Sequence, residues 1–328
     1  MNIVEFTQRN AGIQALRGQL FTASDLPLRK VDFSRNAIRR LNMDVLEGLE
    51  SHLLELHLDH NLLGNNFNPS FSFSEVAKLT ALQTLNLAFN HIREMDVGFL
   101  ATLISLEVLH LEGNSFLAMP TPALKGLDKL KVLTLQENDI DIIKKSALLE
   151  TPTLVFLNVS HNRIVNLEVD AFMELSELVT LDLSYNRLAN LQGGTFNGLT
   201  NLEELDVSSN FLMEVPADAL KDLTKLRTLV LHDNLIQVGQ MIGINIDNLI
   251  QTLGGIVALG PMVNIQHLDL TRNNIGELPT GTFRQLSGLR ILKLAVNSMR
   301  QFHQETLWVP ELDEEGLSDV LICFIVTL

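Results

Sequence analysis

One short phrase recurs along the chain and constrains its fold more than any other feature. The phrase reads apolar-x-x-apolar-x-apolar-x-x-Asn-x-apolar, as in residues 178–188. Its first, fourth and sixth positions are apolar in all eleven copies, and seven of the ten intervals between closing asparagines are 24 residues. So regular a pattern predicts a stack of similar structural units. The closing asparagines are Asn36, Asn61, Asn90, Asn114, Asn138, Asn162, Asn186, Asn210, Asn234, Asn273 and Asn297.

The phrase predicts a short strand followed by a turn. Its fourth and sixth positions flank a fifth that is polar in every copy except Val230, so the strand would bury one face and expose the other. The asparagine amide carries donors and an acceptor, which can satisfy backbone groups where the chain leaves the sheet. We therefore interpret the eleven asparagines as a structural ladder rather than as a functional site.

The second half of each copy predicts the other wall of the stack. Ten residues after most of the asparagines lies another large apolar residue. A single copy buries too few side chains to offset its conformational entropy, so the copies must stack. Phrase and period match the leucine-rich repeat template. We therefore predict an α/β leucine-rich repeat solenoid, a horseshoe with a parallel concave β-sheet, an irregular or helical convex side and about 11 regular repeats.

The pattern divides the chain into three parts. The regular array covers residues 28–309, and residues 310–328 form a tail. Residues 1–27 resemble a degenerate copy with one extra residue before its asparagine, as if the array were entered midway. The matching positions of this copy are Met1, Val4, Phe6, Asn10 and Ile13.

The regular spacing breaks twice inside the array. A 29-residue step holds the extended loop 64–81, where Pro69 cannot donate to a strand ladder, and this predicts a bulging turn at one rim. A 39-residue step holds the insertion 237–264. Its apolar residues fall at helical spacing and predict an extra amphipathic helix, a decorative insertion being the alternative. These residues are Ile246, Leu249, Ile250, Leu253 and Ile256.

The tail ends in an apolar run, residues 320–326, that is too short to span a bilayer. Leu317, Val320 and Ile322 keep the apolar spacing of the phrase and favour a last capping strand. The alternative is the stub of a lipid-anchor signal, which would need a longer apolar tail. Membrane association would thus depend on a segment that the sequence does not clearly contain.

Composition limits the partners and the compartment. The chain has 24 Lys and Arg against 39 Asp and Glu, a net charge of −15 that repels phosphate backbones, so we expect no nucleic-acid partner. Cys323 is the single cysteine, which excludes an internal disulfide framework and indicates a reducing compartment. No secretory signal opens the sequence. Either the protein is intracellular, or the chain is a fragment, which the degenerate first copy favours.

Strand positions that face water form the first candidate partner-binding surface. Third positions of successive copies line up about 4.8 Å apart in a parallel stack, so Val108, Val132 and Phe156 form one column. Phe89 and Tyr185, at the eighth position of their copies, flank that column in this prediction. The five residues predict an apolar contact patch, and β-branched residues chosen for strand propensity alone are the alternative interpretation.

Acidic residues on the same face form the second candidate. Asp182 and Asp206 share the fifth position in adjacent copies, and Glu204 lies beside them. Stacked like charges would attract a basic partner or a cation such as calcium. A solvated acidic face is the alternative. Further acids on this face are Glu203, Asp233 and Asp269.

Other polar residues of this face give weaker signals. Six of the nine histidines project from it and are too dispersed for one metal site; they indicate either a pH-sensitive surface or ordinary polar strand positions. Asn158 begins a glycosylation triplet beside the apolar patch, so a glycan there would shield the patch and shift binding to a rim. The histidines are His57, His60, His110, His161, His232 and His267.

One segment carries a family resemblance. Residues 57–64, His-Leu-Asp-His-Asn-Leu-Leu-Gly, with Asn68-Pro-Ser-Phe-Ser after them, resemble chaoptin and related arthropod leucine-rich repeat proteins. The resemblance implies an extracellular, membrane-anchored glycoprotein that acts in cell adhesion through its repeats. The chain departs from that family in lacking a signal peptide, cysteine-rich caps, a clear anchor signal and part of the repeat number.

Three functions follow from these observations. The first is an extracellular adhesion or recognition module that binds a protein partner, with a second copy of the chain as one option. The second is an ectodomain fragment of a Toll-type receptor, and the third is an intracellular leucine-rich repeat scaffold. The sequence holds no phosphate-cradling loop, paired zinc-ligand spacing or nucleophile elbow, so we expect no enzyme activity, metal or cofactor.

Overall fold

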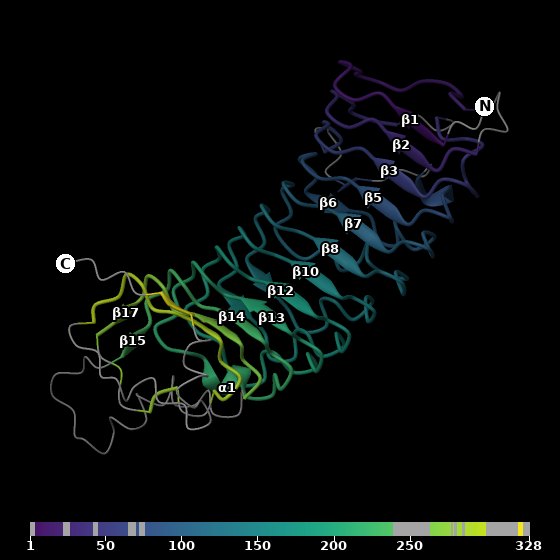
Figure 1. The fold of residues 1–328 in the computed structure, drawn as a ribbon. Helices are drawn as coiled ribbons and strands as arrows, with labels where there is room; N and C mark the ends of the chain where they lie inside the picture. Colours follow the sequence, from purple (N-terminus) through teal and green to yellow (C-terminus); the bar gives the residue numbers. More distant parts are fainter. Residues whose placement is uncertain are drawn as a thin grey trace. The chain divides into compact units, whose positions relative to one another are not determined.

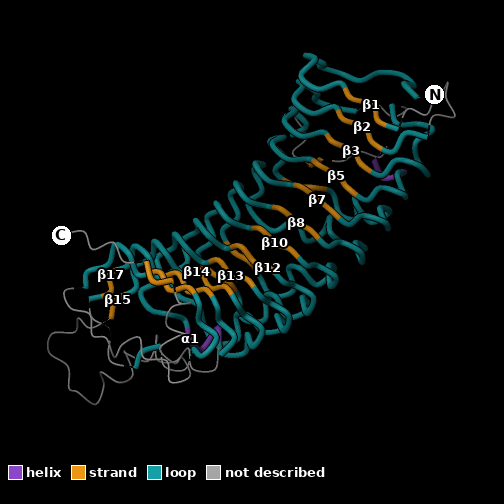
Figure 2. The backbone as a smooth tube through the Cα atoms, viewed as in Figure 1, coloured by secondary structure: helices purple, strands orange, loops and turns teal. Residues whose placement is uncertain are grey.

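The computed structural model consists of short parallel strands joined by turns (Figures 1 and 2). It divides into two compact units, Met1–Arg163 and Ile164–Leu328, which are taken one at a time below. The residues it describes are 4–21, 27–41, 45–64, 70–71, 76–238, 263–276, 278, 281–283, 286–299 and 321–323.

The first unit places one three-residue strand in each coil, and each strand pairs in parallel with the next (Figure 1). The pairing is in register, so that Leu85, Leu109 and Leu133 lie directly opposite one another. The strands of this sheet are β1 (Glu5–Thr7), β2 (Lys30–Asp32), β3 (Glu55–His57), β5 (Thr84–Asn86), β7 (Val108–His110), β8 (Val132–Thr134) and β10 (Phe156–Asn158). Smaller elements of the unit are β4 (Ser70–Phe71), η1 (Val76–Lys78), β6 (Glu94–Met95) and β9 (Ile142–Ile143).

The second unit repeats this arrangement. Its sheet is parallel and in register, with Leu181 opposite Leu205 and Leu205 opposite Leu229. The sheet strands are β12 (Thr180–Asp182), β13 (Glu204–Asp206), β14 (Thr228–Val230), β16 (His267–Asp269), β18 (Ile291–Lys293) and β19 (Leu321–Cys323). The other elements are β11 (Asn166–Leu167), α1 (Ala217–Leu220), β15 (Gln237–Val238) and β17 (Asn274–Ile275), with β15 parallel to β17.

The core of each unit consists of the repeated apolar positions. Leu85, Leu109, Leu133 and Leu181 have no exposed surface, and the large residues ten positions after an asparagine are at most 2% exposed wherever the structure describes their side chains. Among those residues, Phe172 and Phe196 stack at 6.1 Å between ring centroids in the second unit. This pattern confirms the predicted leucine-rich repeat solenoid. The wall opposite the sheet is mostly turns, because α1 is a single turn of helix and η1 is its 3₁₀ counterpart in the described residues.

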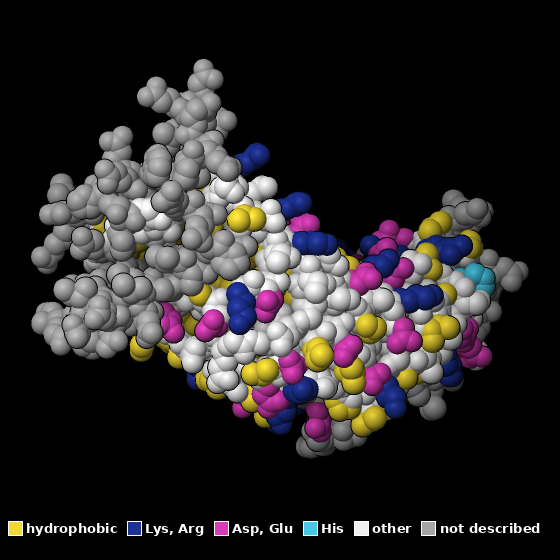
Figure 3. Space-filling model, turned by 90° about the horizontal axis from the view of Figure 1, so that it is seen from below, with side chains coloured by type: hydrophobic (Ala, Val, Ile, Leu, Met, Phe, Trp, Pro, Cys, Tyr) yellow, Lys and Arg dark blue, Asp and Glu magenta, His cyan; other side chains and the backbone are white. Residues whose placement is uncertain are grey.

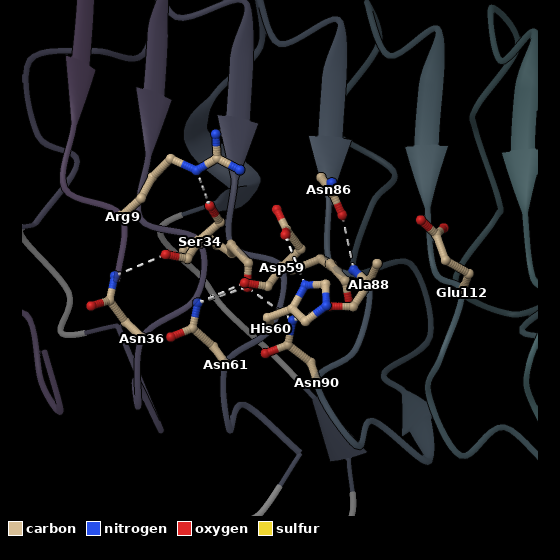
Figure 4. Close-up of polar contacts among 12 residues, drawn as sticks. Arg9, Ser34, Asn36, Asp59, His60, Asn61, Asn86, Ala88, Asn90 and Glu112 are labelled. Atoms are coloured by element: carbon tan, nitrogen blue, oxygen red, sulfur yellow. Dashed lines mark hydrogen bonds and ion pairs between the residues drawn. The ribbon is translucent and has the colours of Figure 1, made fainter. Parts of the chain in front are cut away.

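Asparagine side chains connect successive coils: Nδ2 of Asn36, Asn61 and Asn90 donates to the carbonyl oxygen of Gln8, Phe33 and Leu58, respectively, in the coil before. Figure 4 shows these three asparagines in neighbouring coils. Nδ2 of Asn138 donates to the carbonyl oxygen of Leu111 in the preceding coil at 3.1 Å, and Nδ2 of Asn114 donates to the same oxygen at 2.9 Å. Oδ1 of Asn138 accepts the backbone N–H of Phe116 at 3.1 Å. Each asparagine therefore ties its own turn to the turn before it.

The first coil is present, but the predicted alignment of its residues is wrong by two positions. Phe6 pairs with Val31, so Phe6 occupies the buried fourth position, and Val4, which the phrase placed there, is 50% exposed. Asn10 then falls at the eighth position with φ +52°, a left-handed conformation that asparagine tolerates well. Ala11 stands where the ladder asparagine would be, and no extra residue is needed.

The last strand shows the same kind of shift. β19 pairs in parallel with β18, and Ile322 lies opposite Leu292. Ile322 therefore holds the fourth position that the apolar spacing assigned to Val320. Closely spaced apolar residues fit the phrase in two registers, and the sequence pattern alone does not separate them.

Parts of both irregular segments lie outside the described residues. In the loop 64–81, β4 pairs in parallel with β6, while residues 65–69 and 72–75 are not described. The helix expected in the insertion 237–264 falls on residues 239–262, which are also outside the described part. Within the described residues, no helix has the length and apolar character needed to cross a membrane.

Candidate protein-binding surface

The sheet of each unit has an outward face, made by the third and fifth positions of its strands. In the coils whose strand side chains the structure describes, the central strand residue points into the core, whereas its two neighbours point the other way. In Figure 2 the strands of the first unit lie side by side with no described segment in front of them. This outward face is therefore accessible to a partner.

Three apolar side chains of the first unit meet on this face. Val108 pairs with Val132, and Val132 pairs with Phe156, so the three stand in one column on β7, β8 and β10. All three are partly exposed. These three side chains point away from the core, which is filled by the buried leucines of the same strands. We call these three residues the apolar column.

Phe89, in contrast, lies in a different row from the apolar column. It occupies the eighth position with φ +52°, beyond the end of β5. Its ring stacks on His60 at 4.5 Å between centroids, and it lies so close to Gly113 that a Cβ at that glycine would overlap the ring. His60 is held in turn by Asp59, 3.0 Å from its Nδ1. Phe89 is thus a packing residue of the rim, and Tyr185 holds the equivalent position in the second unit, 49% exposed.

The predicted acidic residues lie together in the second unit. Asp182 on β12 is opposite Asp206 on β13, and Glu204 lies opposite Thr180, whose hydroxyl is 3.4 Å from its carboxylate. Neither aspartate is a free ligand. Oδ1 of Asp182 accepts the backbone N–H of Ser184 at 2.9 Å, and Oδ1 of Asp206 accepts that of Ser208 at 2.8 Å.

This hydrogen bond is a repeated structural device that the phrase did not predict. The backbone N–H of the seventh position lies between two neighbours that donate to the next coil, and it turns back instead to the fifth side chain. An Asp or Asn at the fifth position therefore caps its own turn. The residues that do so are Asp32, Asn86, Asn158, Asp182, Asp206 and Asp269.

Two aspartates of this column differ in their electrostatics. Burial raises the pKa of Asp206, and repulsion from Asp182 adds to that rise, against the hydrogen bonds from Ser208. Burial also raises the pKa of Asp269, but hydrogen bonds from Thr271 and Lys293 outweigh it and hold that pKa below its usual value. The Lys293 ammonium is 3.2 Å from the Asp269 carboxylate. The negative charge of Asp206 therefore destabilises the folded chain, whereas the negative charge of Asp269 stabilises it.

These opposite shifts predict opposite effects of removing the charge. Asn keeps the Oδ1 acceptor, so Asp206→Asn should raise stability at neutral pH. The gain should appear as the pH rises from the pKa of the Asp206 carboxyl group in the unfolded chain through its higher pKa in the folded chain. Asp269→Asn should lower stability, by a loss that vanishes as pH falls through the depressed folded-state pKa. Each change should stay below about 1 kcal/mol. Urea unfolding of both variants between pH 3 and 7 measures this, and equal signs at pH 7 would contradict it.

The remaining predicted residues stay spread over the face. His57, His60 and His110 lie near acidic groups of their own coils, at 3.3 Å from Glu55, 3.0 Å from Asp59 and 3.7 Å from Glu112. In the described parts of the chain, no three His, Cys, Asp or Glu side chains gather closely enough to hold a metal ion. His267 lies on β16, with its pKa lowered by burial and by Lys293.

Asn158 lies in β10, two residues from Phe156 and opposite Thr134. Its side chain is partly exposed, and its Oδ1 accepts the N–H of Ser160 at 2.9 Å. A glycan on Asn158 would project from the same face as the apolar column. The column and the glycan would then compete for the same space.

A second apolar cluster was not among the predicted site residues. Phe211 and Leu235 occupy the tenth position of successive coils, and Met213 occupies the twelfth position of the first. They are 51%, 44% and 65% exposed. Most other copies carry a polar residue at the tenth position, for example Asp139, Arg187 and Asn274, so a column-by-column reading of that position would have found the cluster. On the face shown in Figure 3, by comparison, apolar side chains lie dispersed among acidic and basic ones.

Comparison with known families agrees with this geometry. A family model described as leucine rich repeat matches five segments. Four of them overlap in turn, residues 80–140, 104–164, 152–212 and 176–236, and the fifth is residues 263–311. These segments cover more than half of the chain, and the matched model is a structural repeat rather than an enzyme. The comparison with curated proteins finds no match.

Solved structures with the same fold come from several sources. An internalin from Listeria monocytogenes superposes with a TM-score of 0.65 at 22% identity, covering 93% of this chain and 76% of that one. The Toll–Spätzle complex of Drosophila gives 0.71 at 23%, covering 82% and 35%. The TLR13–ssRNA13 complex gives 0.56 at 22%, covering 86% and 52%. The chain thus spans about a third of the Toll chain, and these likenesses establish the fold.

Proposed function

Because the chain belongs to the leucine-rich repeat family, we propose that it is a protein-recognition module that acts in adhesion at the cell surface and binds its partner through the outward sheet face. The apolar column of Val108, Val132 and Phe156 is the observation that carries the proposal. These side chains are in contact with water and in register, at positions where the fold accepts polar residues. Burying them against a partner would contribute about 25 cal/mol per Å² of apolar surface.

Two further observations support a protein rather than a nucleic-acid partner. The net charge of −15 opposes phosphate, although one structural neighbour is a complex with single-stranded RNA. Another neighbour is a complex of Toll with Spätzle, which shows that a solenoid of this fold can hold a protein ligand. The carboxylates of Asp182, Glu204 and Asp206 would extend contacts in the second unit toward basic side chains.

Adhesion outside the cell is the finer part of the proposal. It is supported by the resemblance of residues 57–64 to chaoptin-type proteins and by the absence of any signal for catalysis in the sequence. A receptor ectodomain would use the same face for a ligand without joining cells. The two functions therefore differ in whether cells that display the chain cluster.

We expect cells that display the chain as a surface-anchored fusion to cluster with one another or with untransfected cells. Val132→Thr with Phe156→Ser should reduce that clustering at least tenfold, because both side chains point outward and the core leucines stay in place. Val97→Ser, which changes a 78% exposed residue away from the sheet, is the matched control and should cluster like the original chain. No clustering by the original chain would refute adhesion, and unchanged clustering by the double variant would refute the role of the column.

The proposal also requires Asn158 to carry no glycan, since a glycan would cover the column. The intact mass of the chain secreted from the same cell type without the surface anchor gives this directly. A mass increase that is abolished by Asn158→Gln would move the binding surface off the apolar column.

A further inference from the structure

The second unit has an exposed apolar cluster at the rim of the solenoid, formed by Phe211, Leu235 and Met213. We call it the rim cluster. The backbone N–H of Phe211 donates to the carbonyl oxygen of Leu188, and that of Leu235 donates to Leu212, each at 2.9 Å. The two residues therefore occupy the same place in successive coils, next to each other along the solenoid.

The core does not need these side chains. Leu212 and Ile236, which follow Phe211 and Leu235, are each 1% exposed and form the apolar layer of this turn. The rim cluster alternates with that layer and points to the opposite side. Within the described residues its row is bounded by Arg187 before it and Asn274 after it, the polar residue types expected at a solvated position. An aromatic, an aliphatic and a methionine side chain grouped at such positions indicate a contact surface.

The charge around the cluster indicates what kind of segment fits it. Residues 180–237 carry eight acidic side chains against four basic ones. Glu214 follows Met213 directly and is exposed, whereas Asp233, two residues before Leu235, is paired with Arg272 at 3.5 Å. Glu204 and Asp206 on β13, earlier in the coil of Phe211, and Asp182 on β12 in the coil before it, form no ion pair with a described basic side chain. A second copy of this acidic chain would bring like charges together, which disfavours self-association at this surface.

We propose that the rim cluster docks a segment of a protein partner that places apolar side chains among lysines or arginines. This inference rests on the proposed recognition function and adds a second contact surface and the chemistry of the ligand. Phe211 and Leu235 would receive the apolar side chains, and Glu214 with the neighbouring acids would attract the basic ones. Within the second unit, the partner would then contact both the outward sheet face and the rim.

The first experiment uses a random peptide-display library selected on the whole chain. We expect enriched peptides to combine aromatic or aliphatic residues with Lys or Arg, and their binding to weaken with salt. Phe211→Ser with Leu235→Ser should weaken the binding of the enriched peptides at least tenfold, and Glu214→Lys several-fold. The matched control is Val165→Ser, because Val165 is 55% exposed at the twelfth position, two coils before Met213. Peptides rich in Asp or Glu, no enrichment, or binding that is insensitive to the double variant would each overturn the proposal.

Two measurements exclude other occupants. Peroxide should oxidise Met213 much faster than Met119, which is 8% exposed, and equal slow oxidation would mean that the chain itself covers the rim cluster. Sedimentation should give the same molecular mass for the original chain and the double variant; self-association that the double variant abolishes would assign the surface to a second copy and overturn the proposal. Unchanged circular dichroism shows that the variants fold.

The outcome separates this inference from the proposed function. Clustering of cells tests the apolar column, whereas peptide selection tests the rim cluster. If the cells cluster but the peptide selection fails, the rim cluster is refuted as a docking surface and the proposed adhesion function stands.

Discussion

Asn138→Ala is expected to lower the free energy of unfolding by about 2–6 kcal/mol, from one unpaired buried N–H at roughly 1–3 kcal/mol and two lost hydrogen bonds at roughly 0.5–1.5 each. Oδ1 of Asn138 is the acceptor for the backbone N–H of Phe116, 3.1 Å away in the preceding coil. Carbonyl oxygens lose less, because the one on Leu111 keeps its bond from Asn114. The loss of stability therefore comes mainly from the unpaired N–H of Phe116.

Urea unfolding measures the total effect, and hydrogen exchange at the Phe116 amide measures its location. Because a repeat array can lose two-state behaviour, the exchange rate is the sharper readout. Asn166→Ala is the matched control, since Asn166 is an exposed asparagine at the edge of a coil, and should change stability by less than about 0.5 kcal/mol. Equal losses for the two variants would show that the ladder bonds contribute little.

Gly198→Ala is expected to destabilise the second unit by roughly 3–4 kcal/mol, because two penalties add. Gly198 has φ +92°, a conformation that L side chains rarely adopt, and an added Cβ would overlap the backbone carbonyl of Met173 in the preceding coil. Backbone cannot move aside as a side-chain end can. The coils would have to separate locally to make room.

Gly194→Ala provides the comparison, since Gly194 has a similar φ of +86° but a roomier setting. Its added Cβ would come no closer than 3.2 Å, to the side-chain ends of Asn197 and Val169. We expect this variant to pay the conformational penalty alone, about 1–2 kcal/mol. Thermal unfolding of both variants gives the difference. A Gly194 variant as unstable as the Gly198 variant would show that backbone overlap is not the dominant cost.

The fold could be predicted from the sequence because burial repeats at fixed spacing. Apolar residues at the first, fourth and sixth positions define a strand with one buried side, and only a parallel stack gives every copy the same neighbours. Both ends were harder. Phe6 and Ile322 stand where the phrase placed Val4 and Val320 two residues away, since strand side chains alternate and a shift of two keeps the same face inward.

The candidate surface could be predicted only in part. Column membership follows from spacing, so Val108, Val132 and Phe156 were recognisable as neighbours. The position of Phe89 was not, because its left-handed backbone turns the ring toward His60 and over Gly113. The repeated phrase does not predict the rim cluster, because after the asparagine it specifies only the buried residue and not the outward residues beside it.

The hydrogen bond from the seventh N–H to the side chain at the fifth position allows the net charge of the chain to change while the turn keeps its conformation. Asp and Asn present the same oxygen to the seventh N–H, at 2.8 Å from Asp206 and 2.9 Å from Asn158. Exchange of one for the other leaves the turn intact and alters only the formal charge. A lineage of such chains can therefore change its attraction to new ligands coil by coil, through single substitutions that keep the turn and shift stability by less than about 1 kcal/mol.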